Sequence, residues 1–301
     1  MSLLNVFSNA VLPVILVFAV GYVLQRTLAP DNRAVARVAF YVFTPCVVFA
    51  SLSQSTLGTA DAGGIVAFFI ISTLALWPLA WGLARRLRLS QRQESAFLLS
   101  ILLNNTGNYG LPLLLFAYGS EGLARGSLFF AGSAVLGNTL GVYLASRGSA
   151  DVLSSLKRLA QVPVVYAVVL ALLFRGLSLA PPEPIYKAVK LLGDAAPPTM
   201  QLLLGMQLAQ IRLGRETKLI GLASLLRLVG GAVLGFAVAR LLGLQGLTRK
   251  VCIVESSMPT AITATVLATE FESDPTFVTG VVFVTTVLSM VTLTILLRLL
   301  M

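Results

Sequence analysis

NNTGNYGLP, residues 104–112, interrupts an apolar run of the sequence that extends from Ala96 to Tyr118. The run is long enough to cross a bilayer, which takes about 20 residues of helix. The stretch carries three amides, two glycines and a proline, and both glycine and proline weaken or interrupt helices. Backbone groups freed inside a membrane must find partners in protein or in a water-filled cavity. We therefore predict a broken helix at this stretch, which is typical of a transport site.

A second stretch, ESSMPTA at residues 255–261, interrupts another apolar run, which extends from Val251 to Ala268. Pro112 in the first stretch and Pro259 in the second are about 150 residues apart, and other prolines repeat with a similar offset. The two halves of the chain, residues 1–150 and 151–301, therefore share one layout.

The composition indicates an integral membrane protein. Of the 301 residues, 57% are hydrophobic and only 11% are charged, with a mean hydropathy of +0.89, whereas soluble domains carry about 25% charged residues. The net charge of +10 comes from short basic clusters between apolar runs, which set membrane orientation and contact the lipid bilayer. We expect no nucleic-acid partner. The sequence has no histidine, which excludes histidine catalysis and most catalytic zinc sites.

We predict an all-α fold of ten membrane spans. They are Val6–Leu24, Val35–Leu52, Gly64–Leu83, Ala96–Tyr118, Leu123–Ala145, Val162–Leu177, Tyr186–Leu208, Leu219–Leu242, Val251–Ala268 and Phe277–Leu300. With five spans in each half, the second half must run inverted relative to the first, and spans four and nine are the broken helices. Inverted repeats place the binding site where such helices meet.

The basic residues favour an orientation with both termini outside the cytoplasm, in a bacterial plasma membrane. Arginine and lysine gather in the gaps after spans one, three, five and seven, while alternate gaps lack them, and basic loops are cytoplasmic. Arg249 and Lys250 violate this pattern. The first apolar run lacks a basic start and a cleavage site, so we expect an uncleaved span.

The two interruptions predict an anion site. We expect each half-helix to begin at its proline, where its unpaired N–H groups and positive dipole end attract an anion. Amide and hydroxyl side chains can add hydrogen bonds. The candidate substrate-binding residues are Asn104, Asn105, Gly107, Asn108, Gly110, Pro112, Asn138, Ser256, Ser257, Pro259 and Thr260. For the asparagines the alternative is a role as helix caps, and Asn138 lies in a small-residue segment suited to helix packing.

The two stretches resemble the auxin efflux carrier family of membrane transporters. The resemblance covers the whole chain and is carried by residues 105–112 with 118–122, and by residues 258–261 with 267–268 and 274–275. It implies a small organic anion, commonly a carboxylate, as substrate. It also implies a scaffold of spans one, two, six and seven that forms a homodimer, and a moving domain of the other spans with an elevator mechanism.

Glu255 departs from the uncharged pattern of many family members, and three roles stay open for it. It can ligate a coupled sodium ion, with Asn105 and half-helix carbonyls as further ligands; the distantly similar sodium-coupled bile-acid transporters also have a glutamate in this crossover. It can carry a coupled proton. It can also form a structural ion pair with Arg227, the one basic residue deep in span eight. No other cofactor is expected.

Other classes of function fit the sequence less well. An enzyme is disfavoured because the chain lacks histidine, a G-x-S-x-G elbow and a nucleotide loop. A passive channel and a sodium-coupled symporter of another organic solute are further alternatives. A cation–proton antiporter is the second choice among transporters, because such exchangers need exposed acidic groups and Glu255 is the single candidate.

Overall fold

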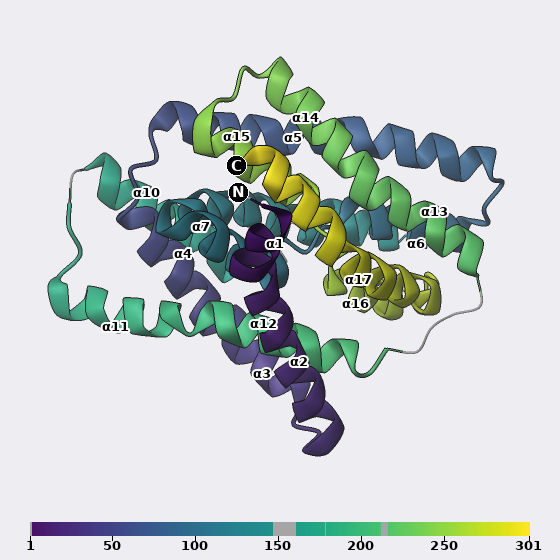
Figure 1. Ribbon diagram of the computed structural model, residues 1–301, viewed down its shortest axis with the longest axis horizontal. Coiled ribbons are helices and arrows are strands. Elements are labelled where there is room, and N and C mark those ends of the chain that lie inside the picture. The colour runs from purple at the N-terminus through teal and green to yellow at the C-terminus, as the bar shows by residue number, and fades with distance from the viewer. Residues whose placement is uncertain (1, 147–160, 178, 212–215) are drawn as a thin grey trace.

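The computed structural model describes residues 2–146, 161–177, 179–211 and 216–301, and these form helices without any strand (Figure 1). The boundary predicted at residues 150–151 and most of the gap between spans five and six lie outside the described residues.

The described part of the first half, residues 2–146, contains eight α-helical segments joined in places by π-helical turns, labelled η. They are α1 (Leu3–Val6), η1 (Phe7–Val11), α2 (Leu12–Thr27), α3 (Asn32–Val38), η2 (Ala39–Phe43), α4 (Thr44–Ser53), α5 (Thr59–Arg86), α6 (Gln91–Leu102), η3 (Thr106–Gly110), α7 (Leu111–Leu136), η4 (Gly137–Gly141) and α8 (Val142–Ala145).

The described part of the second half follows the same plan. Its elements are α10 (Pro163–Gly176), α11 (Glu183–Asp194), α12 (Ala196–Leu208), α13 (Thr217–Leu225), η5 (Leu226–Gly230), α14 (Gly231–Leu241), α15 (Gly246–Ser256), α16 (Ile262–Glu270) and α17 (Pro275–Leu300).

Six helical runs among the described residues are long and apolar enough to cross a membrane. They are Leu3–Thr27, Asn32–Ser53, Thr59–Arg86, Thr106–Ala145, Thr217–Leu241 and Pro275–Leu300, and α10 is a shorter apolar helix of 14 residues. The other predicted spans correspond to helices divided in two: α11 and α12 are separated at Ala195, and α15 and α16 are separated by five residues. The chain is therefore a multi-pass integral membrane protein.

Local sequence explains where several helices begin and turn. Ser90 and Gln93 form a capping box at the start of α6, which satisfies backbone donors there. Asp274 accepts a hydrogen bond from the Phe277 N–H at the start of α17. The long run Thr106–Ala145 is kinked at Gly119. Gly119 has a φ of +66°, which glycine adopts without strain because it has no Cβ. That kink separates the predicted spans four and five.

The helices can be divided into two groups, which contact each other where α4 packs against α7. In one, α2 packs against α12 and α4 packs against α10 and α11; most of these helices lie in the lower part of Figure 1. A Cβ at Gly21 would meet the Leu202 carbonyl and a Cβ at Gly205 would meet the Phe18 carbonyl, so α2 and α12 cross in backbone contact. The other group contains α5 to α8 and α13 to α17.

The contacts repeat between the halves. Within the second group, α5 packs against α6 and α7, just as α14 packs against α15 and α13 packs against α17. The pairs α6–α17 and α15–α7 are related in the same way. Equivalent contacts from both halves agree with a duplicated architecture.

Candidate functional site

Both predicted interruptions are present, and they lie against each other. Helix α6 ends at Leu102 and η3 begins at Thr106, while α15 ends at Ser256 and α16 begins at Ile262. The intervening segments form an isolated antiparallel bridge between Asn104 and Thr260. The Asn105 N–H donates to the Pro259 carbonyl at 2.7 Å, and the Ala261 N–H donates to the Leu103 carbonyl at 2.8 Å. The buried backbone groups that each interruption frees are thus paired with those of the other segment.

The position of the first interruption differs from the expectation. The chain is helical through Gly110 and Pro112, so the half-helix does not begin at its proline, and Pro259 precedes the start of α16 at Ile262. A π-helical turn, η3, accommodates Pro112, which has no N–H to donate. The paired segments interrupt the helix instead, since their backbone hydrogen bonds run between the two segments.

Asn104 holds the two interrupted helices together. Its Nδ2 donates to the Glu255 carbonyl at 2.8 Å, and its Oδ1 accepts from the Ser133 hydroxyl at 3.2 Å. The Thr260 hydroxyl similarly donates to the Ser100 carbonyl at 2.6 Å. The Glu255 and Ser100 carbonyls both lie in the last turn of an interrupted helix, so each of these two bonds joins a helix end to the other interrupted segment. Asn104 is thus a cap, the alternative role considered for the asparagines.

A cavity of about 450 Å³ lies beside the paired segments. Its wall combines residues of both helix groups: Ala36, Phe40, Thr44, Met200, Leu203 and Gln207 from α3, η2, α4 and α12, and Asn104, Asn105, Thr106, Gly107, Asn108, Phe130, Ser133, Gly137, Asn138, Ile262, Thr263 and Glu270 from the other group. It extends from the buried Asn105 to the exposed Glu270. Its size suits a small organic molecule.

The cavity wall contains amide side chains with atoms that have no hydrogen-bond partner in the protein. Asn105 is 4% exposed, yet its Nδ2 has no hydrogen-bond partner. The Gln207 Oε1, on α12 across the cavity, is also buried without a partner. Asn108 is half-buried in the same wall. Asn138 differs, because its Nδ2 donates to the Ala134 carbonyl at 2.9 Å. Buried unpaired polar atoms at a cavity are suited to a ligand.

Two helix N-termini also reach this cavity. Gly107 and Asn108 belong to the first turn after Asn105, and Ile262 and Thr263 form the first turn of α16. First-turn N–H groups have no intrahelical acceptor, and they carry the positive end of the helix dipole. No lysine or arginine is among the described residues that line the cavity. Its attraction for an anion would therefore come from backbone.

The polar side chains of the second stretch point elsewhere. The Ser257 hydroxyl donates to the Ile253 carbonyl at 2.7 Å, and the Ser256 hydroxyl donates to the same carbonyl at 2.9 Å. Neither residue lines the cavity, and nor do Pro259, Thr260, Gly110 or Pro112. These residues lie in or next to the interrupted segments, behind the residues that line the cavity.

Glu255 faces the interior of its own helix group. It is 0% exposed, and neither carboxyl oxygen has a hydrogen-bond partner. A Cβ at Gly110 would lie 2.5 Å from its Oε2, and a Cβ at Gly126 would lie 3.2 Å from its Oε1. Two glycines of the η3–α7 run therefore make room for this carboxyl group, which does not line the cavity.

Arg227 forms no ion pair with Glu255 in the described structure. Its Nη1 donates to the Ile101 carbonyl at 2.5 Å and its Nη2 donates to the Ser256 carbonyl. The structural pair considered from the sequence is therefore replaced by contacts with backbone. Lys190 and Asp194, by contrast, form an ion pair on one face of α11, with Nζ and Oδ2 2.6 Å apart.

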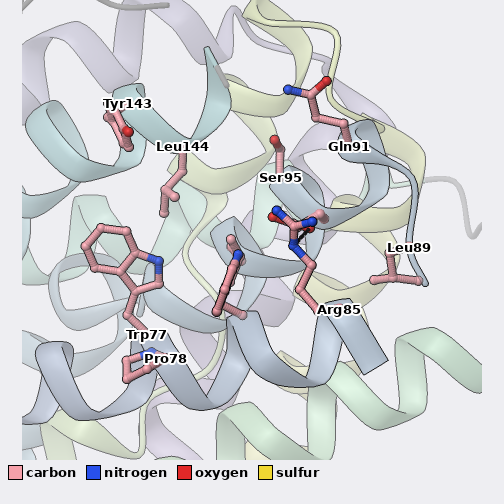
Figure 2. A pocket seen from close by; sticks show the side chains of 11 residues that line it. Trp77, Pro78, Arg85, Leu89, Gln91, Ser95, Tyr143 and Leu144 are labelled. Carbon is pink, nitrogen blue, oxygen red and sulfur yellow. Dashed lines mark ion pairs between the residues drawn. The ribbon is translucent and has the colours of Figure 1, made fainter. Parts of the chain in front are cut away.

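A larger cavity of about 710 Å³ lies away from the interruptions, between α5, α6 and α8 (Figure 2). Trp77 and Trp81 line it, and its basic group, Arg85, pairs with Glu94 at 3.1 Å and lies 5.2 Å from the centre of the Trp81 ring. Because Arg85 is already paired, this cavity presents no free charge.

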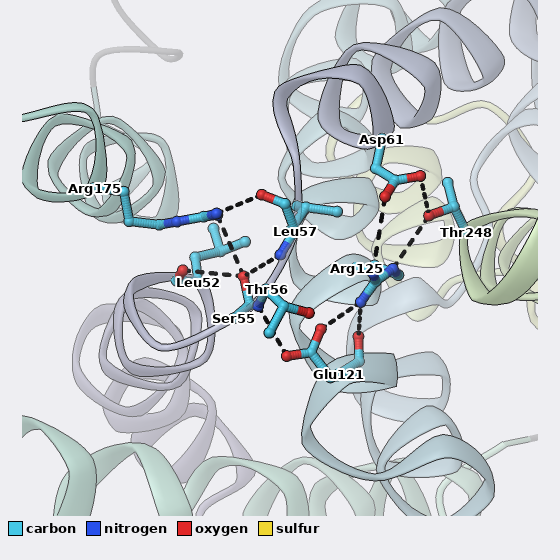
Figure 3. Close-up of polar contacts among 9 residues, drawn as sticks. All are labelled: Leu52, Ser55, Thr56, Leu57, Asp61, Glu121, Arg125, Arg175 and Thr248. Carbon is cyan, nitrogen blue, oxygen red and sulfur yellow. Dashed lines mark hydrogen bonds and ion pairs between the residues drawn. The ribbon is translucent and has the colours of Figure 1, made fainter. Parts of the chain in front are cut away.

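A polar network joins several segments on another part of the molecule (Figure 3). Arg125, buried in α7, pairs with Glu121 at 2.5 Å and with Asp61 of α5 at 3.9 Å, and donates to the Thr248 hydroxyl of α15 at 3.1 Å. Glu121 also accepts from the Thr56 N–H at 2.9 Å, in the connection after α4. None of these residues lines the 450 Å³ cavity. The network thus joins the segment between α4 and α5, which contains Thr56, to α7 and α15.

Sequence reasoning missed Gln207, Thr263 and Ser133 as parts of the site. A polar residue near the end of an apolar helix, as at Gln207, is a weak signal alone, because such residues also lie at membrane surfaces. Only the fold shows that α12 faces the interrupted helices.

The fold and the cavity define the class of this protein: a polytopic helical membrane protein with a partly polar cavity at paired helix interruptions, as found in transporters. The family of membrane transport proteins matches residues 6–151 and again residues 151–297. The chain belongs to this family, that of the auxin efflux carriers, and contains two copies of its repeat.

Two relatives are similar over nearly their full length. An uncharacterized transporter of Methanothermobacter thermautotrophicus is 28% identical over 290 residues, which is 95% of this chain and 96% of the relative. An uncharacterized transporter of Methanocaldococcus jannaschii is 27% identical over 292 residues, 94% of this chain and 95% of the relative.

Proposed function

We propose that this protein is a secondary transporter of a small organic anion, a carboxylate, which binds in the 450 Å³ cavity. The observation that carries the proposal is that two helix N-termini, those of η3 and α16, line one cavity together with unpaired amides. Backbone N–H groups at helix starts favour anions. Asn105 and Asn108 would donate further hydrogen bonds to the carboxylate.

The arrangement of the helix groups supports alternating access. One cavity wall comes from the group of α2, α4 and α10 to α12, the proposed scaffold, and the other from the proposed moving domain of α5 to α8 and α13 to α17. In an elevator mechanism the second group would slide along the first and carry the site. The proposed architecture has ten spans in two inverted repeats, with spans four and nine crossing at the Asn104–Thr260 bridge.

The cavity extends to Ala36 and Glu270. These residues lie beside the gaps after spans one and nine, which we assign to the cytoplasm. The Arg125 network would then lie on the opposite side and keep it closed. This conformation would be inward-facing. We further propose that both termini are extracytoplasmic, that the plasma membrane holds the protein and that the scaffold forms a homodimer.

A cation–proton antiporter fits the geometry less well. Such an exchanger needs an acidic group within reach of the cavity, and Glu255 is fully buried against Gly110 and Gly126.

Binding to the purified protein tests the proposal. Mono- and dicarboxylates are screened by the thermal unfolding midpoint, which a ligand that binds the folded state raises. Labelled counter-flow in proteoliposomes then separates a carrier from a channel. Asn105→Asp and Asn108→Asp, which add negative charge to the cavity, are expected to remove the response to anions.

Asn5→Asp, the same substitution at an exposed residue that precedes the first predicted span, serves as the matched control and is expected to keep the response. The proposal is wrong if no organic anion stabilises the wild type, or if the two cavity variants respond to the anion as the control does.

A further inference from the structure

Arg227 lies between the C-terminal ends of two helices, each of which carries the negative end of a helix dipole. It belongs to η5, is 2% exposed and has no carboxylate within ion-pair distance among the described residues. Guanidinium groups keep their charge in proteins, and a charge buried without a counter-charge is costly. Its position therefore needs an explanation.

The partners of Arg227 are the C-terminal ends of both interrupted helices. Nη1 donates to the carbonyl of Ile101, in the last turn of α6, and Nη2 donates to the carbonyl of Ser256, the last residue of α15. Carbonyls in the last turn have no intrahelical donor and carry the negative end of the helix dipole. Two such ends that converge inside a membrane protein require positive charge between them.

The same carbonyl arrangement is what a bound metal cation uses in transporters with broken helices. Here the planar guanidinium supplies two donors in a fixed fork, one to each helix end. Its Nε has no protein partner, and Arg227 lines a cavity of about 20 Å³ with Ser72 and Thr73, which has room for one water molecule.

We propose that Arg227 is a built-in cation that joins the C-terminal ends of α6 and α15, so that no sodium ion binds between them and transport is independent of sodium. The proposal concerns a positioning residue, since Arg227 does not line the 450 Å³ cavity. It rests on the two helix ends and not on the identity of the transported solute, so it can fail or hold separately from the proposed function.

The first test uses the wild-type protein in detergent. Its thermal unfolding midpoint is measured in sodium chloride and in choline chloride at equal ionic strength. We expect the same midpoint in both, to within about 1 °C, because only a ligand that binds the folded state shifts it. A saturable stabilisation by sodium would overturn the proposal.

The second test removes the cation. Arg227→Gln leaves two negative helix ends facing each other, and we expect a lower midpoint that low-millimolar guanidinium raises, since that ion can enter the vacated space. Arg227→Lys, which keeps the charge but loses the fork, is expected to lie between the glutamine variant and the wild type.

Arg175→Gln is the matched control. Arg175 also donates to a backbone carbonyl, that of Leu57, and to the Ser55 hydroxyl, but it lies on α10 away from the interrupted helices. Its glutamine variant is expected to show no response to guanidinium. Equal responses of the two glutamine variants, or a lysine variant no more stable than Arg227→Gln, would contradict the proposal. If Arg227→Gln does not fold, the sodium comparison on the wild type still decides.

Discussion

The neighbouring residues Asn104 and Asn105 are expected to respond in opposite ways to the same substitution. Asn104→Ala removes a donor to the Glu255 carbonyl at 2.8 Å and an acceptor for the Ser133 hydroxyl at 3.2 Å. Asn105→Ala removes a side chain whose Nδ2 has no protein partner. The first change therefore acts on the fold and the second on the ligand.

The structure sets the magnitudes. Each intramolecular hydrogen bond contributes about 0.5–1.5 kcal/mol, and a buried acceptor left without a donor costs about 1–3 kcal/mol. Loss of both bonds of Asn104 should lower the free energy of unfolding by about 1–3 kcal/mol, since the Glu255 carbonyl keeps the Met258 N–H, 3.3 Å away, as a donor. Substitutions that break no contact are usually within about 0.5 kcal/mol, which is our expectation for Asn105→Ala.

The assay is equilibrium unfolding of both variants in detergent, with and without a saturating organic anion found in the binding screen. Asn104→Ala should lose stability but keep the ligand-induced increment, and Asn105→Ala should keep stability but lose much of the increment. Equal loss of stability in the two variants, or a ligand increment that survives Asn105→Ala unchanged, would refute the assignment of roles.

Three further substitutions test the packing and the network. Gly110→Ala would place a Cβ 2.5 Å from the Glu255 Oε2 and should cost about 1–3 kcal/mol; adding Glu255→Ala should restore part of the loss in a double-mutant cycle, and additive effects would contradict the contact. Gly21→Ala puts a Cβ against the backbone of Leu202, so separation of α2 and α12 should lower the unfolding midpoint by several degrees, while an unchanged midpoint would show that the helices do not touch. Glu121→Gln removes the carboxylate 2.5 Å from a buried guanidinium, and its cost, about 1 kcal/mol for a partly exposed pair, should shrink in high salt; a cost independent of salt would mean that charge is not involved.

The sequence predicted the helical membrane class, the two interruptions and their meeting place. These features follow from composition and from local chemistry, because glycine, proline and clustered amides in an apolar run have few other structural outcomes. The repeat was visible in the proline offsets, and the family comparison supports two copies.

The sequence did not predict which polar groups remain free. Ser256 and Ser257 were expected in the site because they neighbour Pro259, but their hydroxyls donate to the Ile253 carbonyl. Whether a serine faces a cavity or its own helix depends on rotation of the helix, and no local pattern fixes that rotation.

Arg227 shows a second limit. A deep arginine and a deep glutamate suggest an ion pair, because opposite charges are the simplest way to bury both. The pair does not form in the described structure, since two helix C-termini offer Arg227 the negative end of a dipole. Such partners arise only where segments far apart in the sequence come into contact.

An experimental map of the protein with its stabilising carboxylate bound tests the central claim most directly. We predict density for the ligand in the 450 Å³ cavity, with its carboxylate between Asn105 and Asn108 on one side and the first turn of α16 on the other. Ligand density in the 710 Å³ cavity beside Trp77 and Trp81, with the cavity at the helix interruptions empty, would contradict it.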